Sequence, residues 1–515
     1  MERDLSAGVY VAHKGEKIER VTSYLLSIFD LVALSVEEKR LLQHFAALPK
    51  EYIQYELLNQ LVTIDQIYQQ PQKKQLFLRK IIEKIFLGTA KNGKSRRFED
   101  VVSILQDLSD KGWLLTTNEP EAYKIHRIIQ EVVKRKLPPS VVELKELIRN
   151  VADLLHVDDS KDNPVDKFPF IPFGEAVLEL FPDAMDPEIS RLQNELALVL
   201  QDLGDYDKAR AFLEKAIQSD EANFGEQYPT TAVSYSNLAM VLRDLGDYTS
   251  AKELLEKALR SDVANFGENH PKTAVQYSNL AQILQDIGDD ETAKDLLEKA
   301  RQINVTNFGE NHPNTAVNYS NLALALQNLG DEAAAKELLE KALRINEINF
   351  GENHPNTAVN YSNLATIFKN LKEYEEARQL LEKALRIDEA HFGENHPRMA
   401  ITYSNLATVL QDLEDYTDAK NMLEKALRSN VTNFGEDHPN TAVSYTNLAM
   451  VLLDLEEYEK AMLLAIKASR IYTVHLGEQH PDTKSMRENL VAVEKKMLEN
   501  GWTEENINEL LKREE

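Results

Sequence analysis

Residues 230–271 read TTAVSYSNLAMVLRDLGDYTSAKELLEKALRSDVANFGENHP, and this stretch decides the fold because it recurs along most of the chain. The glycine and the proline of its FGENHP segment each return every 42 residues, without an insertion. A fixed period of this length is the signature of a solenoid built from one repeated unit. The glycines are Gly225, Gly267, Gly309, Gly351, Gly393, Gly435 and Gly477. The prolines are Pro229, Pro271, Pro313, Pro355, Pro397, Pro439 and Pro481.

Each copy is predicted to form two helices. The first follows the proline, which suits the first turn of a helix because its missing N–H would have no partner there. The second runs from Tyr248 to about Ala264, and the FG pair ends it, with Gly267 in the left-handed position that glycine favours. Because a lone helix pair cannot bury both faces, neighbouring copies must stack. The first helix carries apolar residues at helical spacing: Val233, Leu238, Val241, Leu242 and Leu245.

Length and composition set the broad class. A chain of 515 residues is too long for one compact core, so two or more units are expected. With 43% hydrophobic and 28% charged residues, it lacks the long apolar run of a membrane span, and its N-terminus lacks the pattern of a signal peptide. It has no cysteine, which excludes disulfides, thiolate nucleophiles and cysteine-ligated metals. We expect a cytoplasmic protein without a cofactor.

Negative charge is concentrated after residue 140. The net charge is −26; residues 1–140 carry 22 Lys and Arg against 18 Asp and Glu, and the remainder carries 37 against 67. An acidic array repels phosphate backbones, so nucleic acid is an unfavourable partner. The acidic residues either keep the surface solvated or form a groove that selects basic ligands.

The pattern within each copy resembles that of the tetratricopeptide repeat family over residues 186–498, and the 42-residue period with its FGENHP junction resembles the kinesin-light-chain subclass. This resemblance implies a mainly all-α fold: a right-handed α-α superhelix of seven repeats plus a partial C-terminal one. Glu195 and Val491 depart from the pattern in the terminal copies, as expected of units that cap an array. A helix opened by Thr503, within 499–515, is expected to seal the end. The matching residues of one copy are Leu238, Ala239, Leu242, Gly246, Tyr248, Ala251, Leu255 and Ala258.

The first helices are expected to line the concave face, as they do in similar arrays. There an asparagine is the same in six copies, while the positions beside it vary. An amide has both a donor and an acceptor, so an asparagine ladder can pair with the backbone of an extended peptide while variable residues read its side chains. Alternatively, the copies are recent duplicates and each asparagine bonds a neighbouring helix. The predicted partner-binding residues are Asn237, Asn279, Asn321, Asn363, Asn405, Asn447, Met240, Arg243, Gln282, Gln285, Gln327, Lys369 and Gln411.

A histidine stands before most junction prolines, and Tyr228 takes its place at the first junction. No second histidine follows at helical spacing, so no pair could chelate a metal ion from one helix. We therefore expect capping or packing at these positions and no metal site. The histidines are His270, His312, His354, His396, His438 and His480.

Residues 20–137 are not repeated, and they follow an N-terminal tail, 1–19. The stretch 96–115 predicts a helix that ends near Gly112 and leads into a short strand, after which the chain turns back into a second strand or a helix. Helices followed by a small hairpin indicate a winged-helix-like domain, and residues 138–185 read as a helical linker. Earlier helices are expected at about 18–32, 36–47, 53–62 and 75–87.

Three stretches of this domain, LSVEEKRLLQHFAALP (34–49), DKGWLL (110–115) and YKIHRIIQEVV (123–133), resemble the winged-helix module of STAND-class (NB-ARC-type) signalling ATPases. In that family the module follows a nucleotide-binding domain and precedes a repeat sensor. The resemblance thus implies a sensor or scaffold of a bacterial STAND-type signalling or defence system. The family's ADP-contacting histidine falls on His126, but Arg127 replaces the usual aspartate, so we expect His126 to pack or cap.

Residues 88–95, GTAKNGKS, match the pattern of a phosphate-binding loop, in which Lys94 would reach the terminal phosphates and Ser95 the magnesium ion. That motif requires a buried strand before it, whereas the preceding residues have helical spacing. A basic loop between helices is the preferred interpretation, and a nucleotide-binding protein is the alternative.

Winged helices also bind DNA, so a DNA-binding regulator is a further alternative. Its basic residues would be Lys91, Lys94, Arg96 and Arg97. Our main prediction is an interaction protein, not an enzyme, whose groove holds a peptide or protein and which binds neither a membrane nor nucleic acid.

Overall fold

The computed structural model describes residues 34–47, 106–111, 115–116, 123–124, 127–157, 163–507 and 510. They fall into two compact units, one within 1–158 and 166–196 and the other within 159–165 and 197–515. The predicted helices at 18–32, 53–62 and 75–87, the loop 88–97 and His126 lie outside the described residues.

The first unit begins with α3 (Val36–Ala46), which confirms the helix predicted at 36–47. A reciprocal cap starts it, since the Glu38 N–H donates to the Ser35 hydroxyl at 3.1 Å and the Ser35 N–H donates to the Glu38 carboxylate at 2.7 Å. The Gln130 side chain of α7 (Arg127–Lys136) donates to the Ala46 carbonyl at 3.2 Å and so ties the two helices together. Strands β1 (Leu115–Thr116) and β2 (Tyr123–Lys124) form an antiparallel pair before α7.

The helix expected in the linker is present as α8 (Val141–Leu155), which Ser140 and Glu143 cap reciprocally. The 3-10 helix η4 (Pro164–Phe170) and α9 (Ile171–Leu180) follow. Two ion pairs join α8 to the start of α10 (Pro187–Asp202). They link Arg149 with Glu188 and Arg191 with Asp153. Glu195, the unusual residue of the first copy, lies 3.1 Å from the ring of His156.

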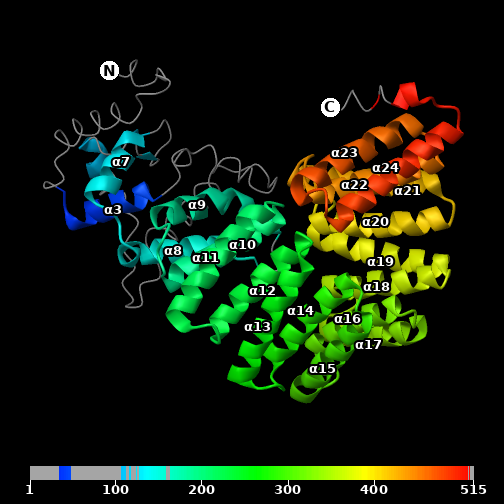
Figure 1. The fold of residues 1–515 in the computed structure, drawn as a ribbon, viewed down its shortest axis with the longest axis horizontal. Coiled ribbons are helices and arrows are strands. Elements are labelled where there is room, and N and C mark those ends of the chain that lie inside the picture. Colours follow the sequence, from blue (N-terminus) through cyan, green and yellow to red (C-terminus); the bar gives the residue numbers. More distant parts are fainter. Residues whose placement is uncertain are drawn as a thin grey trace. The chain divides into compact units, whose positions relative to one another are not determined.

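The array consists of first and second helices in strict alternation, and Figure 1 shows them stacked in sequence order. This confirms the predicted solenoid of helix pairs. The first helices are α10 (Pro187–Asp202), α12 (Pro229–Asp244), α14 (Pro271–Ile287), α16 (Pro313–Asn328), α18 (Pro355–Asn370), α20 (Pro397–Asp412), α22 (Pro439–Asp454) and α24 (Pro481–Glu499). The second helices are α11 (Tyr206–Phe224), α13 (Tyr248–Phe266), α15 (Asp290–Phe308), α17 (Glu332–Phe350), α19 (Tyr374–Phe392), α21 (Tyr416–Phe434) and α23 (Tyr458–Leu476).

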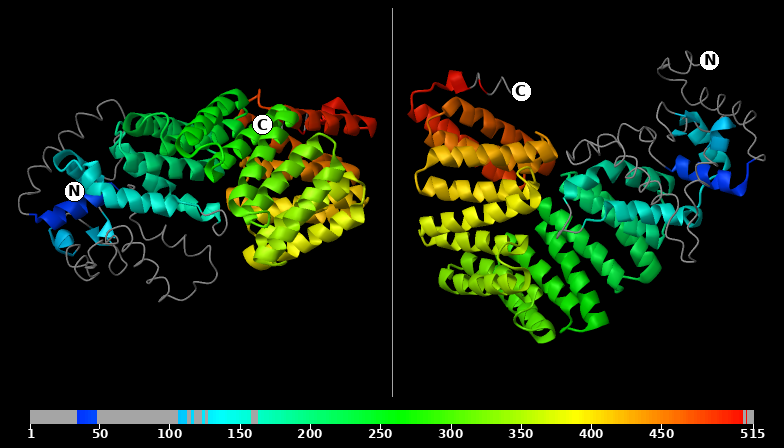
Figure 2. Two further views of the ribbon diagram at one scale, coloured as in Figure 1. Left: turned by 90° about the horizontal axis from the view of Figure 1, so that it is seen from below. Right: turned by 180° about the vertical axis from the view of Figure 1, so that it is seen from behind.

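Each second helix packs against the first helix of its own repeat and against that of the next, so one apolar core runs through the stack. Successive first helices also contact one another, for example α12 and α14. These contacts are closer than those between successive second helices. In a curved stack the closer elements lie on the inside. The first helices therefore form the inner face of the array, and Figure 2 shows the successive layers from two further sides.

Small and branched side chains build this core. Ala239 and Ala251 are fully buried and let the two helices of a hairpin approach closely, while Leu255 fills the space beside them. Val233, which fits the helical period of the apolar residues, is 54% exposed and lies outside the core. Among the helices that the structure describes, none combines the length and apolar character needed to cross a bilayer.

The junction glycine differs in detail from the sequence-based expectation. Gly267 ends α13 with φ 89° and ψ 162°, a region open essentially to glycine alone, and not with the left-handed helical angles predicted for it. The extended ψ sends the chain away from the helix axis toward Pro271. A Cβ on Gly267 would have no atom within 4 Å, so crowding does not exclude a side chain at this position. Glycine is required there because of its backbone angles.

The junction histidines are helix caps, which confirms the predicted capping and packing role. In each of the six, Nδ1 accepts a hydrogen bond from the backbone N–H two residues later, as His312 does from Asn314 at 3.1 Å. The ring of His312 also stacks on Phe308, with centroids 4.6 Å apart. Tyr228 at the first junction stacks on Phe224 but makes no cap.

After α24, the structure describes residues 504–507 of the expected C-terminal helix as helical. The Asn506 N–H donates to the Thr503 hydroxyl at 3.2 Å, and the Thr503 N–H donates back to the Asn506 side chain at 3.3 Å. The buried Ile507 packs into the core at the end of the array.

Candidate partner-binding groove

The ladder asparagines lie on the inner face, on consecutive first helices. Asn279 of α14 and Asn321 of α16 line the same cavity, which has a volume of about 400 Å³. Val275 and Val317, one helical turn earlier, line it too. The 42-residue repeat therefore brings together the side chains that the sequence comparison singled out, at least for this pair of repeats.

The ladder amides are half-buried, and five of the six are unengaged. Within the part of the chain that the structure describes, no hydrogen bond is formed by the side chains of the five members that follow Asn237. This differs from the alternative expectation, in which each asparagine would bond a neighbouring helix. The five are Asn279, Asn321, Asn363, Asn405 and Asn447.

A row of β-branched residues runs beside the ladder, four residues earlier on each of the six first helices from α12 to α22. Its members are between 40% and 64% exposed, although apolar side chains of this size are usually buried. Each repeat thus presents one exposed aliphatic group next to one half-buried amide. The row consists of Val233, Val275, Val317, Val359, Ile401 and Val443.

The side chains predicted to read a partner's sequence occupy two further rows. In the row nearer the ladder, Met240 is half-buried and Gln282 is exposed. In the other row, Gln285, Gln327 and Lys369 are half-buried. Contact of these residues with a partner stays a prediction.

Two members of the second row also link adjacent repeats. Arg243 of α12 forms an ion pair with Asp286 of α14, and the Gln411 side chain donates to Asp454 of α22 at 3.1 Å. Burial would lower the pKa of the Arg243 guanidinium, but the hydrogen bond to Asp286 and the nearby negative charges of Asp286 and Asp244 together outweigh it, so the pKa is raised. These side chains hold the first helices in register, which the sequence comparison did not reveal because both partners occupy polar positions.

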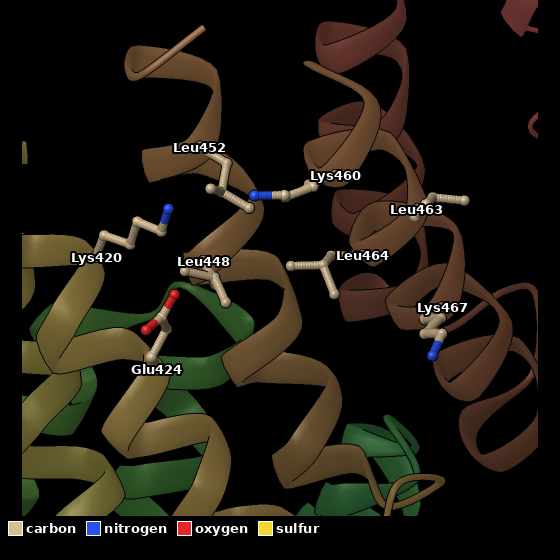
Figure 3. Close-up of a pocket in the computed structure, with 8 residues that line it drawn as sticks. All are labelled: Lys420, Glu424, Leu448, Leu452, Lys460, Leu463, Leu464 and Lys467. Atoms are coloured by element: carbon tan, nitrogen blue, oxygen red, sulfur yellow. The ribbon is translucent and has the colours of Figure 1, made fainter. Parts of the chain in front are cut away.

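A second cavity, of about 280 Å³, lies among α21, α22 and α23 (Figure 3). Leu448, Leu452 and Leu464 form its apolar part, between Lys420 and Lys460. Both lysines pair with the carboxylate of Glu457, so the charges of these two lysines are already matched. The five ladder asparagines from Asn279 to Asn447 differ, because their side chains form no hydrogen bond within the described residues. No cluster of His, Asp and Glu in the described segments is arranged to hold a metal ion.

Comparison with known proteins gives a consistent family match. The tetratricopeptide repeat model matches residues 188–262, 237–304, 272–348, 315–390, 358–430 and 398–473. These matches overlap and together span more than half of the chain. No curated protein matches.

Solved structures with related architecture include a putative kinesin light chain from Podosopora anserina with nearly identical TPR-like repeats. It is 28% identical, over 39% of this chain and 96% of its own, with a TM-score of 0.34. A STAND protein with a tetratricopeptide repeat sensor from Pyrococcus horikoshii is 17% identical, over 93% of this chain and 63% of its own, with a TM-score of 0.47.

Proposed function

The chain belongs to the tetratricopeptide repeat family, and we propose from this that it is an interaction protein whose inner groove holds an extended peptide segment of a partner. The asparagine ladder binds the peptide backbone, and the neighbouring rows contact its side chains. The protein serves as a scaffold or sensor and performs no reaction of its own.

The unengaged state of the five ladder amides from Asn279 to Asn447 supports this proposal most directly. A half-buried amide that forms no hydrogen bond loses part of its hydration without compensation. Five such amides, one on each of five consecutive first helices, form a row of donors and acceptors at a constant spacing. An extended backbone offers carbonyl and N–H groups at a regular spacing as well, so it can satisfy the row whatever its sequence.

The exposed aliphatic row supports a peptide over nucleic acid. Around Asn279 and Asn321 the cavity is lined by Val275, Val317 and uncharged polar groups, and Lys272 is its one charged residue. Apolar side chains of a peptide gain about 25 cal/mol per Å² of surface that they bury in such a site. Binding should therefore depend weakly on salt, whereas binding to a phosphate backbone would fall steeply with salt.

A peptide selected on the protein from a displayed random-sequence library provides a probe for the test. Replacing Asn321 and Asn363 by alanine removes two backbone partners, so we expect the dissociation constant to rise by about tenfold or more, at about 0.5–1.5 kcal/mol for each hydrogen bond. Fluorescence anisotropy measures the constant, and circular dichroism checks that the helices are intact.

The matched control replaces Asn328 and Asn370, which lie on the same two helices, α16 and α18. Their side chains bond to Asp290 and Glu332 at 2.8 and 3.0 Å, away from the ladder. The control should bind the peptide as the parent chain does. Equal affinity in the ladder variant and the parent would show that the ladder is structural.

We further propose that the array is the sensor of a STAND-type signalling protein that acts in the cytoplasm. This rests on the sequence resemblance of the N-terminal third and on the order α3, hairpin β1–β2, α7, which suits a winged-helix domain. Affinity purification of the full chain from its host should recover a nucleotide-binding domain, either on the same polypeptide or on a partner. Recovery of the chain alone, in repeated preparations, would contradict this role.

A further inference from the structure

The first hairpin of the array touches a junction far along the sequence, within the same unit. The ring of His438 donates through Nε2 to the Asp202 carbonyl at 3.2 Å, and Nδ1 of His475 lies 3.4 Å from the Gly204 carbonyl. A Cβ on Gly204 would lie 3.0 Å from His438 Nε2 and 3.2 Å from Pro439 Cδ. At this turn a side chain is excluded by the close approach of the junction.

The second hairpin repeats this contact one repeat later. A Cβ on Gly246 would lie 2.8 Å from Cδ2 of His480 and 3.3 Å from Cδ of Pro481. The separation in sequence between glycine and histidine is 234 residues in both contacts. Two consecutive turns therefore dock on two consecutive junctions in one register, which is how the two ends of a regular curved stack meet.

Other repeats use the same turn without such a contact. Gly288 and Gly330 occupy the equivalent position, and a Cβ on either would have no atom within 4 Å. The later repeats carry Lys372, Glu414 and Glu456 there, with φ between 61° and 63°. The turn itself thus accepts a long side chain at positive φ, and only Gly204 and Gly246 are confined by a neighbour.

The contact encloses a polar cavity of about 380 Å³ between the two ends. Tyr206, Asp244 and Tyr248 line it from the first hairpins, and Asn440 and Tyr472 from the last. Burial raises the pKa of Tyr206 and of Tyr472. Each end thus contributes a tyrosine that is shielded from water.

We propose that these contacts form a seam, made by Asp202, Gly204 and Gly246 on one side and His438, His475 and His480 on the other, by which the array closes on itself as a latch. Closed, the inner groove makes one complete turn around a bound segment. Open, the ends separate and a segment enters or leaves. The role of the latch in retention rests on the proposed function of the groove, whereas the closure itself does not.

The absence of native cysteines makes the closure measurable with two introduced ones. In the full chain, Asp207→Cys and Asn440→Cys place exposed thiols on the two sides of the seam. Residue 440 lines the cavity, and residue 207 directly follows Tyr206, which lines it too. Pyrene labels on both thiols should give excimer emission when the seam is closed. Gly204→Glu with Gly246→Glu should abolish the emission, because a glutamate side chain does not fit against the junctions.

Gly288→Glu with Gly330→Glu is the matched control, with the same substitutions at the two open turns. It should keep the excimer emission, and all variants should keep their helical circular dichroism. Absence of the excimer in the parent chain, or equal loss in the control, would overturn the closure. Excimer emission that requires mixing of singly labelled chains would show that the seam joins two copies, which also contradicts the proposal.

Retention is tested on the same proteins with the library-selected peptide. We expect its dissociation rate to rise several-fold in the variant at Gly204 and Gly246 and to stay unchanged in the control. If the excimer is lost but the dissociation rate does not change, the latch has no role in retention. If the ladder variant at Asn321 and Asn363 keeps full affinity while the excimer behaves as expected, the proposed groove function fails and the closure stands.

Discussion

The guanidinium of Arg398 in α20 lies 3.3 Å from the carboxylate of Asp388 in α19, which is 2% exposed. The Thr402 hydroxyl donates to the same carboxylate at 3.2 Å. Burial raises the pKa of Asp388, and the charge of Arg398 opposes this rise. The ion pair with Arg398 therefore stabilises the buried charge of Asp388 at the junction between two hairpins.

The other copies show how this junction is matched. Where the equivalent of Asp388 is an asparagine, the residue ten positions later is also an asparagine. The Asn346 side chain donates to the Asn356 carbonyl at 3.3 Å and the Asn430 side chain to the Asn440 carbonyl at 2.9 Å. The acid at 388 is thus paired with the cation of Arg398, whereas the amides at 346 and 430 bond a backbone carbonyl and need no charged partner.

We predict that Arg398→Asn lowers the free energy of unfolding by about 1–3 kcal/mol at pH 7, because it leaves an ionised carboxylate buried with one hydroxyl partner. The loss should shrink as the pH falls, since protonation of Asp388 removes the charge. Adding Asp388→Asn creates the combination found at 346 and 356 and should restore most of the stability. Denaturant unfolding measures all three proteins. A double variant as unstable as the single one would contradict this account.

Capping and stacking by His312 can be separated with substitutions that the array itself suggests. His312→Asn keeps a cap acceptor and loses the ring, while His312→Tyr keeps the stack on Phe308 and loses the cap, as Tyr228 does. We expect each to lower the free energy of unfolding by about 0.5–2 kcal/mol, and His312→Ala to lower it by roughly the sum. A tyrosine variant as stable as the parent would show that the cap contributes nothing.

The seam should open as the solution is acidified, because His438 is neutral when the seam is closed. Its Nδ1 accepts from the Asn440 N–H at 3.0 Å, which leaves no lone pair for a proton. Burial lowers the pKa of His438 to about 4; His475 also disfavours its charge, while the carbonyls of Asp202 and Leu203 favour it. An exposed histidine titrates near 6.5, so the open state binds the proton first and closure weakens as the pH falls from about 6.5 toward about 4.

The pyrene excimer measured against pH checks this prediction. His438→Asn keeps a cap acceptor without a titrating ring, so its excimer should no longer fall as the pH is lowered through that window. His312→Asn serves as the control and should keep the change. Asp244, whose pKa burial raises, acts in the opposite sense but is common to all these proteins. The same pH midpoint in the His438 variant and the parent would refute the assignment to His438.

The helix pairs and the ladder could be predicted because they depend on local rules. The proline, the Gly-Asp turn and the apolar spacing define each hairpin, and α13 ends two residues beyond the predicted Ala264. Asn279 and Asn321 were found by comparing copies, since a position that is constant and yet off the apolar stripe needs another explanation. The backbone angles at Gly267 were predicted wrongly. Glycine is favoured at any positive φ, and the sequence does not show which region of positive φ the residue adopts.

The seam could not be predicted from such local rules. Its existence depends on the small rotation between successive hairpins, summed over five repeats, and no single residue determines that sum. The sequence nevertheless holds one trace of it. Glycine occupies the confined turns at Gly204 and Gly246, whereas three of the later turns carry Lys372, Glu414 and Glu456.

The constant spacing of 234 residues across the seam makes closure depend on how many units the gene encodes. Loss of one internal unit would place His480 opposite Gly204 and leave none of the six junction histidines opposite Gly246, so this half of the contact would be lost. Gain of one unit would place His396 opposite Gly204 and add Gly288 opposite His480. Unequal recombination between these near-identical segments would therefore change closure in either direction. Loss of a unit would weaken the contact between the two ends of the array, and gain of a unit would extend it.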